Sequence, residues 1–199
     1  MTRLRRDSVP SNQPGLQEAV KHEAGHAVAY WCHGWHFRYV TMRPRAENVI
    51  AGVRMYRERV CDTPAKLVTS MECAAAGRIA QFHMSGDTAS HQLLRNEFMR
   101  VSGPPFLETY ADVDMRQFVK AGTALDYHGV WPAGPDGWLK IWHNAESNIT
   151  GELWPAVIAV ASELMISPRR LSYEEVSAIV STVLPSISNG NAGTPWTTL

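Results

Sequence analysis

The stretch LQEAVKHEAGHAVAYW, residues 16–31, determines the fold class expected of this chain. Its apolar residues recur three or four positions apart, and this spacing predicts an amphipathic helix. At about 100° per residue the apolar arc centres near Leu16 and Ala27, while His22 and His26 lie on its flank. The stretch therefore predicts a helix packed on one side, with two histidines at the edge of the packed face.

His22-Glu23-Ala24-Gly25-His26 is an HExxH sequence. Four residues are slightly more than one helical turn, so both imidazoles project from the same side and can bind one metal ion. Neutral imidazole suits Zn²⁺, and two histidines plus a third protein ligand leave one position for water. Glu23 can take a proton from the water that attacks a peptide carbonyl and return it to the leaving amine. The alternative is two surface histidines beside an ordinary amphipathic helix.

The motif does not fix the third ligand, because no histidine follows His26 at the HExxHxxGxxH spacing. His33 and His36 lie past the predicted helix end and are candidates for a position near the site. The other candidates that ligand chemistry allows are Asp87, His91, Glu97, Glu108, Asp112 and Asp114.

A capping argument separates Asp112 from Asp114. Asp112 completes a capping-box pattern that begins at Thr109, and capping accounts for its position. Asp114 points about 200° away and shares a helix face with Phe118 and Ala121. A carboxylate that faces inward needs a positive partner, and a metal ion would supply one. This favours Asp114.

The remaining patterns predict more helices and one small β element. The expected elements are short strands at 40–42 and 49–56 joined by a turn at 43–48, and helices from 63–64 onward, at 109–126, at 138–165 with Pro155 as a kink or a new start, and from 172 onward. The fold class is therefore mainly α with one small β-hairpin or sheet. The expected organisation is a flexible arm (1–15), one domain (16–184) and a flexible tail (185–199).

Composition excludes several classes of protein. The 199 residues are 45% hydrophobic and 19% charged, which argues against general disorder. The net charge is zero, so the chain lacks the positive field of a non-specific nucleic-acid binder. Three cysteines without a CxxC argue against a disulfide framework, and the most apolar charge-free stretch (153–162) is about half the length of a membrane span. The chain is expected to be soluble and cytoplasmic.

Five stretches in order resemble the peptidase domain of FtsH-type ATP-dependent zinc metalloproteases. They are HEAGHA (22–27), VTMRPR with AGV (40–45 and 51–53), AAGRIA (75–80), ADVDM (111–115) and the closing helices (153–180). The resemblance implies zinc bound by His22, His26 and Asp114, with Glu23 as general base. It also implies a substrate strand near Val49–Met55, with Val49, Gly52 and Val53 as substrate-binding residues.

The chain also departs from that family. It has no GxxxxGK[ST] phosphate loop, its 84–110 connection is longer, and Tyr110 replaces a glycine before Ala111. The sequence therefore predicts a stand-alone, ATP-independent zinc endopeptidase that cuts unfolded or flexible protein segments, or that relies on an ATPase in trans. A homo-oligomer is compatible with the resemblance. The alternatives are a regulatory HExxH protease with one dedicated protein substrate, and a non-catalytic, metal-stabilised helical binding protein.

Overall fold

The structure is a computed structural model that describes residues 15–44, 49–56, 61, 63–86, 94, 96, 99, 113–129, 134–166, 170–187 and 196. Within these residues the chain is mainly helical with a small antiparallel sheet, as the sequence predicts. The elements are α1 (Leu16–Cys32), β1 (Phe37–Pro44), β2 (Val49–Met55), α2 (Pro64–Ser85), α4 (Val113–Tyr127), α5 (Gly134–Thr150), α6 (Trp154–Ile166), β3 (Arg170–Leu171) and α7 (Tyr173–Val183).

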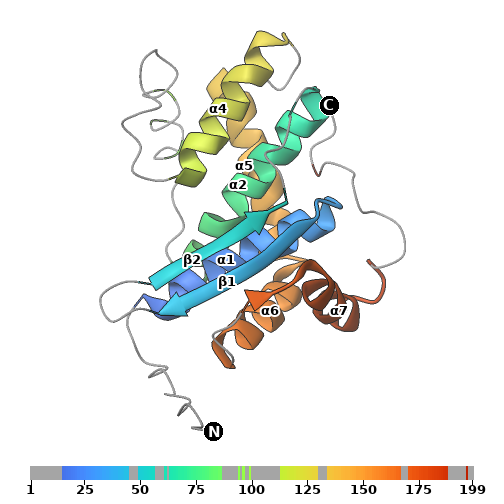
Figure 1. The fold of residues 1–199 in the computed structure, drawn as a ribbon. Helices are drawn as coiled ribbons and strands as arrows, with labels where there is room; N and C mark the ends of the chain where they lie inside the picture. The colour runs from blue at the N-terminus through green and yellow to red at the C-terminus, as the bar shows by residue number, and fades with distance from the viewer. Residues whose placement is uncertain are drawn as a thin grey trace, which may run out of the picture.

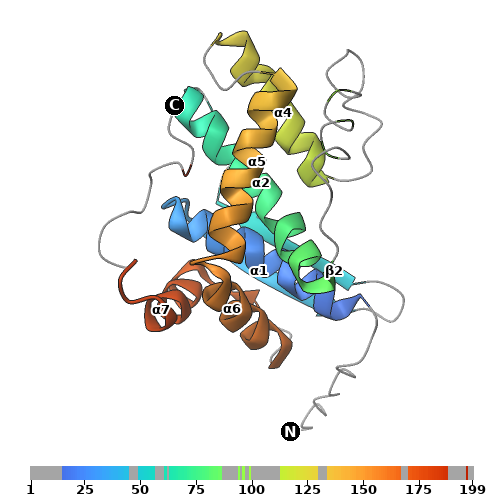
Figure 2. The same ribbon diagram turned by 180° about the vertical axis from the view of Figure 1, so that it is seen from behind.

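The helix that carries the HExxH motif, α1, lies at the centre of the fold. The sheet covers one side of α1 (Figure 1), and α5 and α6 lie on the opposite side (Figure 2). Helix α2 packs along α1, and α4 and α5 pack on α2 in turn. Eleven residues of α1 are buried, including both Glu23 and His26 of the motif. The motif is therefore held by neighbours on several sides instead of lying on an open helix face.

Gly25 lets α1 and α2 approach closely. A Cβ at this position would lie 2.6 Å from the backbone oxygen of Ala76 and 2.8 Å from the Cβ of Ala80, both in α2. Such distances are too short for real Cβ contacts, so the motif's glycine is a packing requirement of the helix pair.

The sheet has the order β2-β1-β3. Strand β1 pairs antiparallel with β2 over Phe37–Pro44, which confirms the predicted hairpin, and with β3 through Val40 and Thr41. The predicted bounds of the first strand (40–42) are too short, because Arg43 and Pro44, expected in the turn, pair with Ile50 and Val49. The sequence patterns do not predict β3, because two residues have no periodicity of their own and exist as a strand only through β1. Among the described strands β2 is an edge strand.

Local signals set several helix boundaries. Thr63 caps α2 by accepting a hydrogen bond from the Lys66 amide at 3.4 Å. Ser172 and Glu175 form the predicted capping box of α7 with bonds of 3.2 and 2.8 Å. The sequence left open whether Pro155 kinks one long helix or starts a second one. The chain breaks at 151–153 and Pro155 lies in the first turn of α6, so a second helix starts there.

No single described helix is long and apolar enough to cross a membrane. Helices α5 and α6 meet that criterion only together, as a pair bent by 69°. The predicted arm (1–15) lies almost wholly outside the described residues, and so does most of the predicted tail (185–199). Within that tail, the backbone amide of Trp196 donates to the Glu72 carboxylate at 3.2 Å.

Candidate metal centre

Two helices bring three metal-ligating side chains together. Helix α1 presents His22 and His26, and the first turn of α4 presents Asp114. The Nε2 atoms of the two histidines are 3.1 Å apart. The Oδ2 atom of Asp114 lies 2.8 Å from Nε2 of His22 and 3.1 Å from Nε2 of His26. Residues 88 and 92 positions apart in the chain thus converge on one point.

Hydrogen bonds on the far side of each ring fix the orientation of both imidazoles. His26 donates from Nδ1 to the backbone oxygen of Cys73 at 2.8 Å, and His22 donates from Nδ1 to Oε1 of Gln81 at 3.2 Å. In a neutral imidazole the nitrogen that donates carries the only proton, so in the neutral form of both rings the Nε2 lone pairs face each other and Asp114. This second shell, both parts of it from α2, is the arrangement that typically supports metal-ligating histidines.

The donor set fits a tetrahedral divalent ion. Ligands at about 2.0–2.1 Å from zinc in a tetrahedron are roughly 3.3 Å apart, close to the observed triangle of 2.8, 3.1 and 3.1 Å. Three lone-pair donors at these separations repel one another unless a positive charge lies between them. Nitrogen and oxygen donors suit zinc, but they are not specific to it.

Gly77 makes room for the His26 ring against α2. A Cβ at position 77 would lie 2.3 Å from Nε2 of His26, the atom that faces the other two donors. Since His26 is itself held by the Cys73 carbonyl in the same helix, the ring cannot move away without losing that bond. The position of the His26 ring therefore requires glycine at position 77.

We expect Gly77→Ala to weaken zinc binding by about 10- to 100-fold, the range typical of second-shell changes. Alanine in a helix ordinarily stabilises a protein by roughly 0.5–1 kcal/mol relative to glycine. Here overpacking against His26 should instead lower the free energy of unfolding by about 1–3 kcal/mol. Urea unfolding of the metal-free protein and a zinc competition titration measure both effects. A stabilised variant with unchanged zinc affinity would contradict this position of His26.

Glu23 lies beside the three donors and is 8% exposed. Burial raises the pKa of its carboxyl group above the ordinary value; the charges of His26 and His22 oppose this rise, and that of Asp114 adds to it. A carboxylate with a raised pKa is a better base near neutral pH. The role of Glu23 as a general base stays a prediction, and the raised pKa is compatible with it.

The charges within the cluster shift the titration of its members in opposite directions. Burial lowers the pKa of His26, but the charge and hydrogen bond of Asp114 outweigh it and raise that pKa to about 9. Burial raises the pKa of Asp114, but the two histidines outweigh it and lower that pKa well below the ordinary value. In the metal-free protein the proton on His26 partly fills the place of a cation.

We expect zinc affinity to fall as pH falls. Because metal needs the neutral imidazole, zinc must displace the His26 proton at every pH below about 9. Displacement of one proton weakens the apparent affinity by about tenfold for each pH unit below that value, and the affinity should level off above it. Competition titrations at several pH values measure the slope. An affinity that is flat between about pH 7 and 8 would contradict protonation of His26.

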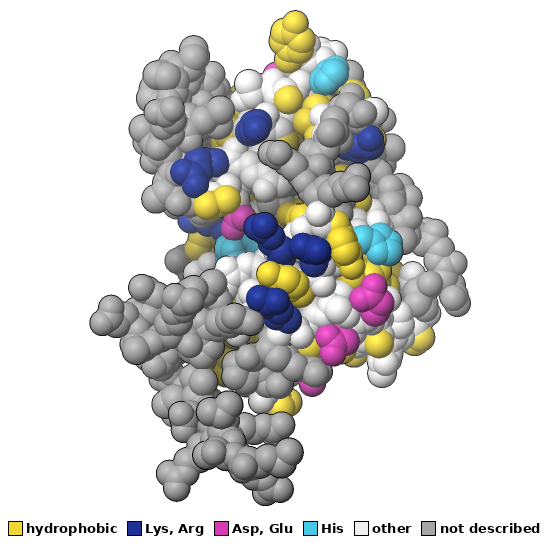
Figure 3. All heavy atoms as spheres, viewed as in Figure 1, with side chains coloured by type: hydrophobic (Ala, Val, Ile, Leu, Met, Phe, Trp, Pro, Cys, Tyr) yellow, Lys and Arg dark blue, Asp and Glu magenta, His cyan; other side chains and the backbone are white. Residues whose placement is uncertain are grey.

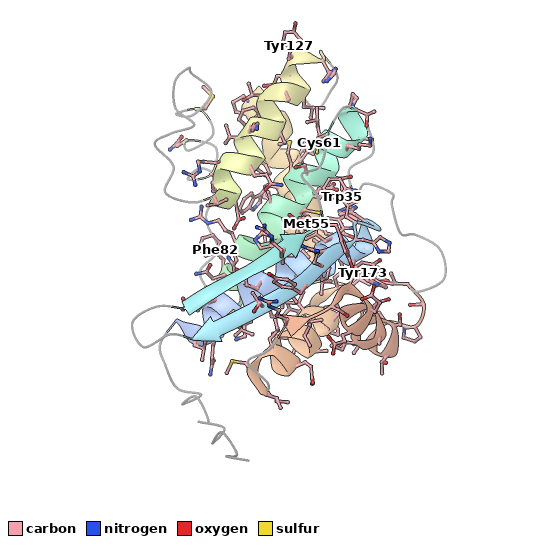
Figure 4. All side chains as sticks on the ribbon, viewed as in Figure 1. Trp35, Met55, Cys61, Phe82, Tyr127 and Tyr173 are labelled. Atoms are coloured by element: carbon pink, nitrogen blue, oxygen red, sulfur yellow. The ribbon has the colours of Figure 1, made fainter. Side chains whose placement is uncertain are left out.

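A cleft of about 1080 Å³ lies between β2 and α4, next to the cluster. Tyr30, one of its lining residues, stacks on His26 with ring centroids 6.4 Å apart. Val113 and Gln117, also in the lining, flank Asp114 in the sequence of α4. At the end of β2, Trp35, Met55 and Cys61 lie close together (Figure 4) and line the cleft. The cleft therefore adjoins the cluster through Tyr30 and the first turns of α4, and it extends along β2; His22, His26 and Asp114 are not among its lining residues.

The predicted substrate residues belong to β2, but they differ in their relation to this cleft. Val53 lines the cleft, whereas Gly52 is outside its lining. A Cβ at Gly52 would meet open space. Val49 pairs with Pro44 at the start of β2, and its side chain lies outside the described residues.

Of the third-ligand candidates, Asp114 is the one that the structure brings to the histidines. The others, Asp87, His91, Glu97, Glu108 and Asp112, lie outside the described residues. His33 lies elsewhere: its Nε2 is 3.3 Å from the Glu72 carboxylate, and its ring packs on Trp196. His36 stacks on Tyr173.

Sequence reasoning misses the supporting residues in α2. Gln81, the Cys73 carbonyl and Gly77 all contact the histidines. Gly77 lies in the AAGRIA stretch of the family resemblance, but the sequence assigned none of the three a role beside the histidines. The three residues are four positions apart and so share one face of α2. This spacing points to the histidines only when α2 is known to pack on α1.

Comparison of the chain with models of protein families, and with curated proteins, gives no match. The site is thus interpreted from its geometry.

Proposed function

We propose that this protein is a zinc-dependent endopeptidase of the HExxH type that acts on unfolded or flexible protein segments. The observation that carries the proposal is the convergence of His22, His26 and Asp114 within 3.1 Å of one another, with Glu23 buried beside them. A bare pair of surface histidines would need neither the third donor nor the second shell. The similarity to the FtsH-type peptidase domain leads to the same four residues.

His22, His26 and Asp114 would hold the zinc ion, which supplies a Lewis acid that polarises a peptide carbonyl and acidifies water. Glu23 accepts the proton of the attacking water and gives it to the leaving nitrogen as the peptide bond breaks. Gln81 and the Cys73 carbonyl keep both imidazoles in the tautomer that leaves Nε2 available. Burial of Glu23 keeps bulk water away from the carboxyl group that moves the proton.

The substrate would be an extended chain. Strand β2 is the edge of the described sheet and borders the cleft beside the cluster, so an extended segment can add to it through backbone hydrogen bonds. A folded protein cannot offer such a segment, and the sequence has no phosphate loop that would power unfolding. Folded substrates would thus need an ATPase in trans. None of the three cysteines is in a disulfide, which suits a reducing compartment such as the cytoplasm.

The experiment that tests the proposal compares the zinc-loaded protein with zinc-loaded Glu23→Gln on a permanently unfolded protein chain. Cleavage by the wild type, its loss on chelation and its loss in the variant support the proposal. Tight zinc binding without cleavage of any unfolded chain would instead favour a metal-stabilised binding protein. Cleavage of one native partner alone would favour the regulatory protease.

A further inference from the structure

The cleft beside the metal cluster carries a positive charge that the proposed reaction does not use. Arg54 of β2 and Arg116 and Lys120 of α4 line its two walls. No Asp or Glu is among its described lining residues. The ion pairs found among the described residues involve none of these three cations.

Two of the cations, Arg116 and Lys120, lie on the face of α4 that lines the cleft. Val113, Arg116, Gln117, Lys120, Ala121 and Ala124 line the cleft at spacings of three and four, which is one continuous stripe of a helix. Arg116 and Lys120 are one turn apart on that stripe and follow Asp114 by two and six residues. Figure 3 shows Lys and Arg side chains over the sheet and the adjoining end of α4, while most of the Asp and Glu side chains in this view lie toward α7. The charge is therefore local, because the chain as a whole is neutral.

Between the cations the cleft is apolar. Val53, Met55, Leu67 and Ala121 line it, and Val113, which directly precedes Asp114 in the chain, is 63% exposed. At about 1080 Å³ the cleft lies at the upper limit of small-molecule sites, about 300–1,000 Å³, and has room for several residues of a peptide. An exposed apolar surface with cations on two walls is complementary to a segment that combines apolar and acidic side chains.

We propose that the cleft selects peptide segments in which apolar residues are flanked by Asp or Glu, with Arg54, Arg116 and Lys120 as the specificity-determining residues. The proposal rests on the proposed peptidase function, since it assigns the substrate class of that site. A peptide suits the cleft better than a nucleic acid does, because the β2 edge offers backbone hydrogen bonds and the surface between the cations is aliphatic.

Binding of labelled peptides tests this inference without any need for cleavage. Three short fluorescent peptides share one apolar centre and carry flanking Glu, Gln or Lys residues. Fluorescence anisotropy at low salt, with the zinc-loaded Glu23→Gln variant, should give a Kd about tenfold lower for the Glu peptide than for the Gln peptide, as two or three partly exposed ion pairs would produce. The Lys peptide should bind most weakly. Raising the salt to about 0.5 M should remove most of the preference.

Variants of the two walls locate the effect. Arg116→Gln with Lys120→Gln, and separately Arg54→Gln, should each weaken binding of the Glu peptide several-fold and leave the Gln peptide unchanged. Arg170→Gln is the matched control, because Arg170 lies on β3 at the opposite edge of the sheet, over the Tyr39 ring, and outside the cleft lining. It should leave the preference intact.

The outcomes separate this inference from the proposed function. Equal affinity for the three peptides, or a preference that survives both wall variants, overturns the inference even where the wild type cleaves unfolded chains. A charge preference that the wall variants abolish supports the inference even where no cleavage occurs. A single-stranded oligonucleotide that binds as tightly as the Glu peptide, and loses affinity in the same variants, overturns the choice of a peptide.

Discussion

Glu23→Gln should lower kcat on an unfolded substrate by about 10³-fold and leave zinc binding intact. The amide of glutamine has nearly the shape of the carboxylate but cannot accept the proton of the attacking water, and general acid–base catalysis contributes about 10²–10⁴-fold. Zinc should remain, because His22, His26 and Asp114 converge without any part played by Glu23. The measurements are steady-state cleavage rates and zinc content of the same protein samples.

Glu18→Gln is the control for this change. Glu18 is exposed in the first turn of the same helix. Glu18→Gln therefore makes the same carboxylate-to-amide change in α1, but at a position outside the cluster. We expect wild-type rates from it. Should Glu23→Gln retain more than about a tenth of the wild-type kcat while Glu18→Gln is normal, another group must move the proton, and the assigned role of Glu23 is wrong.

Asp114→Ala should weaken zinc binding by at least about 100-fold. Loss of an outer-shell partner alone typically costs 10–100-fold in metal affinity, and Asp114 supplies a donor atom to the site itself. The fold should persist, because the helix-dipole contribution of this partly exposed carboxylate is only about 0.3–1 kcal/mol, and His26 can lose its proton instead of staying charged without the Asp114 partner. Zinc competition titration and circular dichroism of the metal-free variant measure the two effects.

Asp136→Ala is the matched control, since Asp136 is an exposed carboxylate in the first turn of α5 and is not part of the cluster. It should bind zinc as the wild type does. Wild-type affinity in Asp114→Ala would mean that a different side chain completes the site. The open candidates in that case are those outside the described residues, including Glu108 and Asp112.

Local sequence signals predict most of the helices because each of these boundaries depends on neighbouring residues. Thr63 caps α2 and Ser172 caps α7 through contacts within a few residues, so no tertiary context is needed. Strand β3 escapes such reasoning, since Arg170 and Leu171 form a strand only by pairing with β1. The predicted relationship to the FtsH-type family and the zinc identity of the ion stay predictions.

For the site, the sequence predicts the contacts within one helix turn, whereas the contacts between α1, α2 and α4 depend on how these helices pack. Residue spacing alone predicts that His22 and His26 lie on one side of a helix with Glu23 beside them, because helical geometry fixes neighbours four residues apart. The sequence also favoured Asp114 as the third ligand, because its side chain shares a helix face with apolar residues. It gave no distance between Asp114 and the histidines.

Three features are visible only in the folded chain: the Asp114 oxygen that reaches both imidazoles, the contacts of Gln81 and Gly77 with the rings, and the cationic cleft between β2 and α4. The physical reason is that these contacts join α1, α2, α4 and β2 across long separations in the chain. Periodicity reports which face of an element is buried, but the partner of that face is selected by packing of the whole core.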